Sequence, residues 1–142
     1  MITTEEKLDF PIREIMTRQL HTVNVDMKMV DVRHKMAKWH VRHVPVLQKG
    51  KLVGIISLTD IQRMSFSNTY GDDEMSIDDT ISDMFTAGMV MHEHPETVDM
   101  AASIREAAVK LSQREFHAFP VMDGDKLAGI ITTTDLLKYL VS

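Results

Sequence analysis

The chain contains an internal repeat, and this repeat limits the possible folds more than any other feature. Shifting the sequence by 75 positions aligns Ile15–Asp60 with Val90–Asp135 without a gap, and 13 of the 46 aligned pairs are identical. A chain of 142 residues is long enough for one compact core and hardly for two independent ones. We therefore expect the two copies of the repeat to share a core.

Each copy has the same predicted order of elements. Turn sequences, QKG in the first copy and DGD in the second, separate two short apolar runs and predict a β-hairpin. Side-chain oxygens at Thr59 and Asp60, and at Thr134 and Asp135, are typical of a helix start, so a helix is expected after each hairpin, over IQRM in the first copy and LLKYLV in the second. An earlier amphipathic helix is predicted from apolar residues at helical spacing, which are Met29, Val32, Met36 and Trp39 in the first copy and Ile104, Ala107 and Leu111 in the second. With a strand before it, each copy is β-α-β-β-α.

The repeat also sets the expected domain boundaries. The first copy with its N-terminal segment occupies residues 1–64, and the second copy occupies residues 87–142. Residues 65–86 form a polar, acidic linker in which a short helix is expected to begin at Ser76 or Asp79. Together the parts are expected to form one compact module.

Composition excludes several classes of function. The chain is 44% hydrophobic and 26% charged, as in ordinary soluble domains, and no apolar run approaches the roughly 20 residues of a membrane span. Acidic residues near the N-terminus are unlike a signal peptide, so we expect a cytoplasmic protein without membrane contact. The absence of cysteine excludes disulfides, thiolate metal sites and cysteine nucleophiles. A net charge of −5 gives no general attraction to nucleic acid.

The motifs in the two copies resemble a known family. The order Met-Thr, Thr-Val, helix, HVPV, hairpin and GIISLTD is similar to a cystathionine-β-synthase (CBS) domain, and the two copies, over about residues 11–140, resemble a stand-alone CBS pair. The resemblance implies an α+β fold in which two β-α-β-β-α repeats pack with pseudo-twofold symmetry. It also implies two clefts that bind AMP, ADP or another adenosyl ligand for regulation and energy sensing, with no required cofactor.

The repeated strand ends have a chemistry that fits such a ligand. A carboxylate at a helix start can accept hydrogen bonds from both ribose hydroxyls, and a hydroxyl three positions earlier can support the same ring. Asp60 with Ser57, and Asp135 with Thr132, have this spacing. The alternative is that both aspartates only cap helices, each contributing about 1 kcal/mol. We favour ribose binding because helix capping accounts for the aspartates but not for the paired hydroxyls.

The family resemblance implies which residues complete each cleft. A family arginine before the aspartate is replaced by Thr59 and Thr134, which favours a monophosphate, a diphosphate or an uncharged adenosyl group over a triphosphate. Basic residues before the Pro-Val strand are expected to meet phosphate, namely Arg42 and His43 in the first copy and His117 in the second. The cleft of Asp60 is expected to contain Ile55, Ser57, Met91, His92 and Phe116, and the cleft of Asp135 to contain Ile130, Thr132, Met16, Thr17 and Val41.

Other chemistries receive less support from the sequence. His92 and His94 on a strand would suit zinc or nickel, but this stretch lies at the variable turn before Thr97, and its counterpart in the first copy is Thr-Arg-Gln, so no metal is expected. No catalytic triad or phosphate-binding loop has a recognisable spacing, so the chain is not expected to be an enzyme. Two functions remain: a nucleotide-sensing module that regulates an unidentified partner, and an interaction domain with vestigial clefts. In either case, a second apolar helix face, with LLKYLV at the carboxyl end and Met64 at the matching place, predicts a homodimer.

Overall fold

The chain folds into two compact units that cross the boundaries of the sequence repeat. The structure is a computed structural model that describes residues 1–68 and 84–142, with the backbone alone for residues 64–68. One unit, here the central unit, is His21–Pro95, and the other, here the terminal unit, combines Met1–Leu20 with Glu96–Ser142. Each unit therefore takes one segment from the other copy of the repeat. The helix predicted at Ser76 or Asp79 lies outside the described residues.

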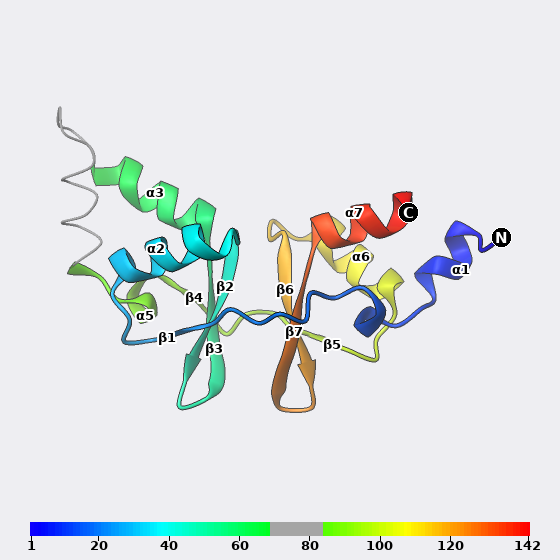
Figure 1. The fold of residues 1–142 in the computed structure, drawn as a ribbon, viewed down its shortest axis with the longest axis horizontal. Coiled ribbons are helices and arrows are strands. Elements are labelled where there is room, and N and C mark those ends of the chain that lie inside the picture. The colour runs from blue at the N-terminus through cyan, green and yellow to red at the C-terminus, as the bar shows by residue number, and fades with distance from the viewer. Residues whose placement is uncertain (69–83) are drawn as a thin grey trace. The chain divides into compact units, whose positions relative to one another are not determined.

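The central unit is built on a four-stranded sheet in the order β1-β2-β3-β4 (Figure 1). β1 is parallel to β2, whereas β2, β3 and β4 are antiparallel neighbours. The hairpin of β2 and β3 comes from the first copy, and β4 is the short segment from the second copy. The elements are β1 (Val23–Asn24), α2 (Met29–Trp39), β2 (His43–Gln48), β3 (Lys51–Ser57), α3 (Leu58–Asn68), α5 (Ala87–Val90) and β4 (His92–Glu93).

The terminal unit repeats this plan with a three-stranded sheet in the order β5-β6-β7. Again the first pair is parallel and the hairpin pair is antiparallel. Thr17 bridges to Ile130 on β7, as His92 pairs with Ile55 on β3, so the same exchange of a segment occurs in both units. The elements are α1 (Thr4–Leu8), the 3-10 helix η1 (Ile12–Glu14), β5 (Val98–Asp99), α6 (Ile104–Gln113), β6 (Ala118–Asp123), β7 (Lys126–Thr132) and α7 (Thr133–Val141).

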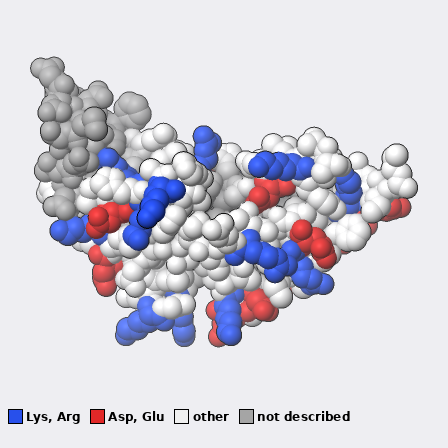
Figure 2. Space-filling model, in the orientation of Figure 1, with Lys and Arg blue, Asp and Glu red and all other residues white. Residues whose placement is uncertain are grey.

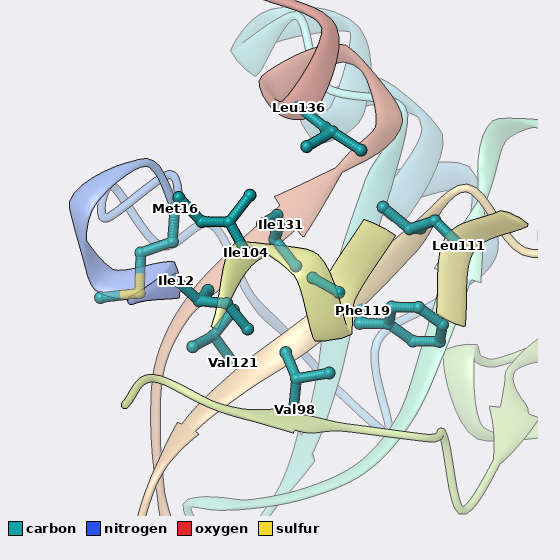
Figure 3. Packing of buried hydrophobic residues seen from close by; sticks show 10 residues of the cluster. Ile12, Met16, Val98, Ile104, Leu111, Phe119, Val121, Ile131 and Leu136 are labelled. Carbon is teal, nitrogen blue, oxygen red and sulfur yellow. The ribbon is translucent and has the colours of Figure 1, made fainter. Parts of the chain in front are cut away.

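Each unit has its own cluster of buried apolar side chains. The sequence predicted one core shared by the two copies, whereas the buried residues form two clusters. Figure 3 shows the cluster of the terminal unit, where Ile12 and Met16 of the N-terminal segment lie among side chains of the second copy. The predicted helix faces are confirmed by burial of Met29, Val32 and Met36 on α2 and of Ile104, Ala107 and Leu111 on α6. Trp39, also predicted for the α2 face, is half-buried against the same cluster.

The predicted elements are confirmed in type and order, and the α+β class with them. The two hairpins turn at the predicted QKG and DGD sequences. The helices predicted over IQRM and LLKYLV begin three residues earlier than expected, α3 at Leu58 and α7 at Thr133. α3 also continues to Asn68, beyond residue 65, where the linker was expected to begin.

The described surface carries charges of both signs. Figure 2 shows lysine and arginine side chains scattered among acidic and uncharged ones on the visible face of each unit. Within residues 1–68 and 84–142, no helix combines the length and the apolar character needed to cross a membrane.

Candidate functional site

Asp60 is held at the start of α3 by reciprocal hydrogen bonds with Ser57. Its Oδ2 accepts hydrogen bonds from the Ser57 backbone N–H at 2.9 Å and from the Ser57 hydroxyl at 2.8 Å. In return, the Asp60 backbone N–H donates to the Ser57 hydroxyl oxygen at 3.1 Å. This is a capping box, in which a hydroxyl residue before the helix and an acidic residue three positions later each satisfy a backbone donor.

Asp135 has the same role at the start of α7. Its Oδ2 accepts the Thr132 backbone N–H at 3.0 Å, and its own backbone N–H donates to the Thr132 hydroxyl at 3.1 Å. Thr132 is the N-cap residue, so Asp135 is the third residue of the helix and not its cap. The capping box is thus repeated in both copies.

The capping boxes correct one argument made from the sequence. We reasoned that helix capping would account for the aspartates but not for the hydroxyl residue three positions earlier. That reasoning was wrong, because a capping box requires both residues at this spacing. The spacing alone therefore no longer favours ribose binding over a structural role, and the case depends on the rest of the site.

A segment from the other copy of the repeat contacts each carboxylate at Oδ1, the oxygen that takes no part in capping. In the central unit, His92 Nε2 lies 2.8 Å from Asp60 Oδ1. In the terminal unit, the Thr17 hydroxyl donates to Asp135, at 3.1 Å from Oδ1 and 3.3 Å from Oδ2. Thr17 and His92 occupy equivalent positions in the repeat. Both aspartates therefore have one side engaged in capping and the other turned toward an incoming segment.

Two glycines allow these segments to approach. A Cβ atom on Gly129 would lie 2.6 Å from the Thr17 carbonyl oxygen and 3.1 Å from the sulfur of Met16. On Gly54, a Cβ atom would collide with the sulfur of Met91 and lie 2.9 Å from the His92 carbonyl oxygen. Real side chains do not reach such distances, so only glycine fits beside each segment. Gly54 and Gly129 therefore mark the places where the facing segments come closest to β3 and β7.

The basic residues expected to meet phosphate lie beside the helix starts. The Arg42 carbonyl accepts the Leu58 backbone N–H at 2.8 Å, and the His117 carbonyl accepts the Thr133 N–H at 3.0 Å. His43 on β2 lies opposite Ser57 in the hairpin register. Arg42 and His43 are thus near Asp60 within the central unit, and His117 is near Asp135 within the terminal unit.

The surroundings of Asp60 lower the pKa of its carboxyl. Burial by itself would raise this pKa, because the side chain is only 10% exposed. Hydrogen bonds from the Ser57 backbone and hydroxyl, together with the contact to His92, more than offset burial and bring the pKa below its ordinary value. The Asp60 site therefore favours the charged carboxylate, the form that accepts hydrogen bonds from a ligand.

This lowered pKa predicts a specific dependence of stability on pH. The folded chain binds the Asp60 proton more weakly than the unfolded chain does. The charged carboxylate therefore makes its full contribution to the free energy of unfolding above the unfolded pKa of about 4, and this contribution is lost as the pH falls through the lower pKa of the folded chain. Below about pH 4, the free energy of unfolding should decrease more steeply for the wild type than for Asp60→Asn. Chemical denaturation at a series of pH values tests this, and parallel curves for the two proteins would contradict it.

The predicted site residues divide between the two units. Met91 packs against the core of the central unit, and Met16 is part of the core of the terminal unit. Val41 and Phe116 were each assigned to a cleft whose aspartate lies in the other unit, so both assignments stay predictions. The central unit contains Asp60, Ser57, Ile55, Arg42, His43, Met91, His92 and Val41, and the terminal unit contains Asp135, Thr132, Ile130, Met16, Thr17, His117 and Phe116.

The structure adds a role that the sequence did not suggest. His92 was expected in the cleft of Asp60, and its ring contacts the Asp60 carboxylate directly. The equivalence of His92 and Thr17 in the repeat could have indicated this, had the two been compared as partners of the aspartates. His94 follows the end of β4 in a left-handed backbone conformation, so it does not continue the strand on which a two-histidine metal site was considered. Among the described residues, no three histidine, aspartate or glutamate side chains are grouped to hold a metal ion.

Comparison with known proteins agrees with the fold and the repeat. The CBS domain of a CBS domain containing membrane protein from Sphaerobacter thermophilus superposes with a TM-score of 0.81 at 28% identity, covering 95% of this chain and 90% of that one. CBSX2 from Arabidopsis thaliana has a TM-score of 0.80 at 23% identity, covering 93% and 94%. A crystal structure of CBSX2 in complex with AMP has a TM-score of 0.75 at 23% identity, covering 93% and 96%.

Sequence relatives are mostly longer proteins. The L-aspartate semialdehyde sulfurtransferase of Methanocaldococcus jannaschii is 24% identical over 129 residues, which cover 89% of this chain and 22% of the relative. The chain spans less than half of the length of this and two further curated relatives, at 22%, 32% and 46%. A family model described as "CBS domain" matches residues 12–66 and 76–142. Because that match includes both copies of the repeat and most of the chain, the chain belongs to the CBS domain family and contains a pair of its repeats.

Proposed function

We propose that the chain is a regulatory module that binds an adenine nucleotide, AMP or ADP, or a related adenosyl ligand, at Asp60 and Asp135. The observation that carries the proposal is the carboxylate repeated at two helix starts, whose Oδ1 lies outside the capping box and faces a neighbouring segment. A negative carboxylate in this position can accept both hydroxyls of a ribose. The AMP complex of CBSX2, a protein of similar fold, supports this choice of ligand.

The phosphate end of the ligand is proposed to lie near Arg42 and His43. Arg42 is exposed and lies beside the start of α3, where backbone N–H groups also favour an anion. A monophosphate or diphosphate matches this small number of positive groups better than a triphosphate does. We propose that ligand binding changes the arrangement of the two repeats and that an unidentified partner protein responds to this change. Cytoplasmic location and the lack of catalysis stay predictions.

A thermal-shift series tests the proposed ligand class. A ligand that binds only the folded chain raises the melting temperature, so AMP and ADP should raise it more than ATP, and more than guanosine monophosphate as a control for the base. Arg42→Ala should reduce the shift with AMP more than the shift with adenosine, because only AMP carries the phosphate. The absence of any shift with AMP, ADP, ATP, adenosine and S-adenosylmethionine would contradict the proposal.

The second candidate is an interaction domain with vestigial clefts, and exposed apolar side chains on the terminal unit favour it. Leu137 and Val141 on α7 are 57% and 85% exposed, and Val109 on α6 is 47% exposed. Apolar side chains of this size on neighbouring helices are typical of a surface that a partner covers. Under either function we propose that a second copy of the chain is this partner.

Light scattering tests the dimer directly. At micromolar concentration, the wild type should have about twice the chain mass of 16.2 kDa, and Leu137→Arg should shift the population toward the monomer because it places a charge in the apolar contact. Lys138→Arg on the same helix preserves charge and should leave the dimer intact. A wild-type mass equal to that of one chain would contradict the proposal.

A further inference from the structure

The two aspartates differ in the number of acceptor positions that the described protein groups leave open. A carboxylate offers about four positions for hydrogen-bond donors. At Asp60, three are filled, by the Ser57 N–H, the Ser57 hydroxyl and the His92 ring. At Asp135, two are filled, because the single hydroxyl hydrogen of Thr17 is shared between both oxygens and Thr132 supplies one N–H.

This difference matters for a ligand with two neighbouring hydroxyls. A ribose that donates both of its hydroxyls needs two open acceptor positions on one carboxylate. Asp135 offers two without any change in the protein. Asp60 offers one, so the second hydroxyl can bind there only if an existing donor leaves. The Ser57 N–H belongs to the capping box of α3 and the Ser57 hydroxyl binds the same Oδ2, which leaves His92, on Oδ1, as the exposed donor that has to move.

His92 has the properties of a group that can leave. A carboxylate only accepts hydrogen bonds, so the ring nitrogen at 2.8 Å is a donor. The His92 side chain is 43% exposed, whereas Asp60 behind it is only 10% exposed. The ring therefore covers a nearly buried carboxylate from the solvent side. At the equivalent position, Thr17 is a shorter neutral side chain with longer contacts to its aspartate.

We propose that His92 makes the two sites unequal toward a ribose: the Asp135 site binds first, and the Asp60 site stays closed until the His92 ring turns away. The inference rests on the proposed nucleotide function and adds to it an order of binding set by one side chain. The Asp60 site should be weaker by about tenfold, the equivalent of one charge-assisted hydrogen bond. Exchanging the residues between the two positions should exchange this difference.

Isothermal titration calorimetry with AMP provides the main test. The wild type should show a tight and a weak site, and Asp135→Asn should leave the weak one while Asp60→Asn leaves the tight one. His92→Thr should bring the Asp60 site to within a few fold of the other, and Thr17→His should weaken the Asp135 site by about tenfold. His92→Asn is a second variant for the same position if His92→Thr lowers the melting temperature strongly.

A nuclear magnetic resonance titration gives an independent readout of the ring. The imidazole signals of His92 should stay in place during the first equivalent of AMP and move during the second. The order of binding would be overturned if both sites had equal affinities and His92→Thr had no effect. It would also be overturned if the His92 signals moved with the first equivalent of AMP. Either result would leave the nucleotide function standing. No heat of binding with AMP, ADP or adenosine would remove the nucleotide function, and the order of binding with it.

Discussion

Replacing both Asp60 and Asp135 by asparagine is expected to weaken AMP binding by at least about tenfold at each site while the chain stays folded. Asparagine keeps a side-chain oxygen that can accept the backbone N–H of the capping box. It removes the negative charge and one acceptor, which costs at least one charge-assisted hydrogen bond of roughly 1.5 kcal/mol. Calorimetry with AMP measures the change in affinity, and thermal unfolding checks the fold.

A matched control separates ligand binding from helix capping. Thr132→Ala removes the hydroxyl that accepts the Asp135 backbone N–H but leaves the carboxylate and its acceptor positions unchanged. It should lower the free energy of unfolding by about 1 kcal/mol and leave most of the AMP affinity at Asp135. If the double asparagine variant binds AMP as tightly as the wild type, the aspartates serve the helices alone, and the interaction domain becomes the better hypothesis.

Gly129→Val is expected to destabilise the terminal unit by about 3 kcal/mol or more, the upper range for forcing a side chain into a packed space. The obstacle is the Thr17 backbone, because a Cβ atom would lie 2.6 Å from its carbonyl oxygen. Thr17 and Ile130 also exchange two backbone hydrogen bonds of 2.8 and 3.0 Å, which the displaced segment would lose. AMP binding at Asp135 should fall together with stability, since Thr17 also contacts that carboxylate.

The two glycines provide a graded comparison for this prediction. At Gly54, the nearest obstacle to a Cβ atom is the end of the Met91 side chain, which is flexible, and the His92 carbonyl oxygen is farther away at 2.9 Å. Gly54→Ala should therefore cost less stability than Gly129→Ala in urea denaturation. Equal stability of Gly129→Val and the wild type would show that the Thr17 segment is not held where the structure has it.

The sequence predicted the regular elements well because their signals are local and strong. Val32 and Met36 recur at helical spacing and are buried, and the turn around Gly124 joins two apolar runs that pair as a hairpin. The exchange of segments had no comparable signal. β4 contains two residues, and Thr17 makes only an isolated bridge, so neither has a hydrophobic pattern long enough to predict a pairing.

The site was harder to predict because one residue pattern serves two physical purposes. Ser57 and Asp60 have the spacing of a capping box, and the same carboxylate is suited to a ribose. A single sequence cannot separate these roles, since both require a hydroxyl residue and an acid at the same positions. The contact between His92 and Asp60 depends on a tertiary pairing of residues 32 positions apart, which no local pattern in the sequence reveals.

The assignment of Met1–Leu20 to the terminal unit has a consequence for folding during synthesis on the ribosome. The central unit, His21–Pro95, is contiguous and can fold as soon as its last strand has left the exit tunnel. The N-terminal segment is made first but must wait for Glu96–Ser142, because Ile12 is fully buried only among residues of that later stretch. Until Glu96–Ser142 has been made, Ile12 and Met16 lack the core that buries them, so we expect the N-terminal segment to expose apolar side chains of the kind that chaperones of nascent chains bind.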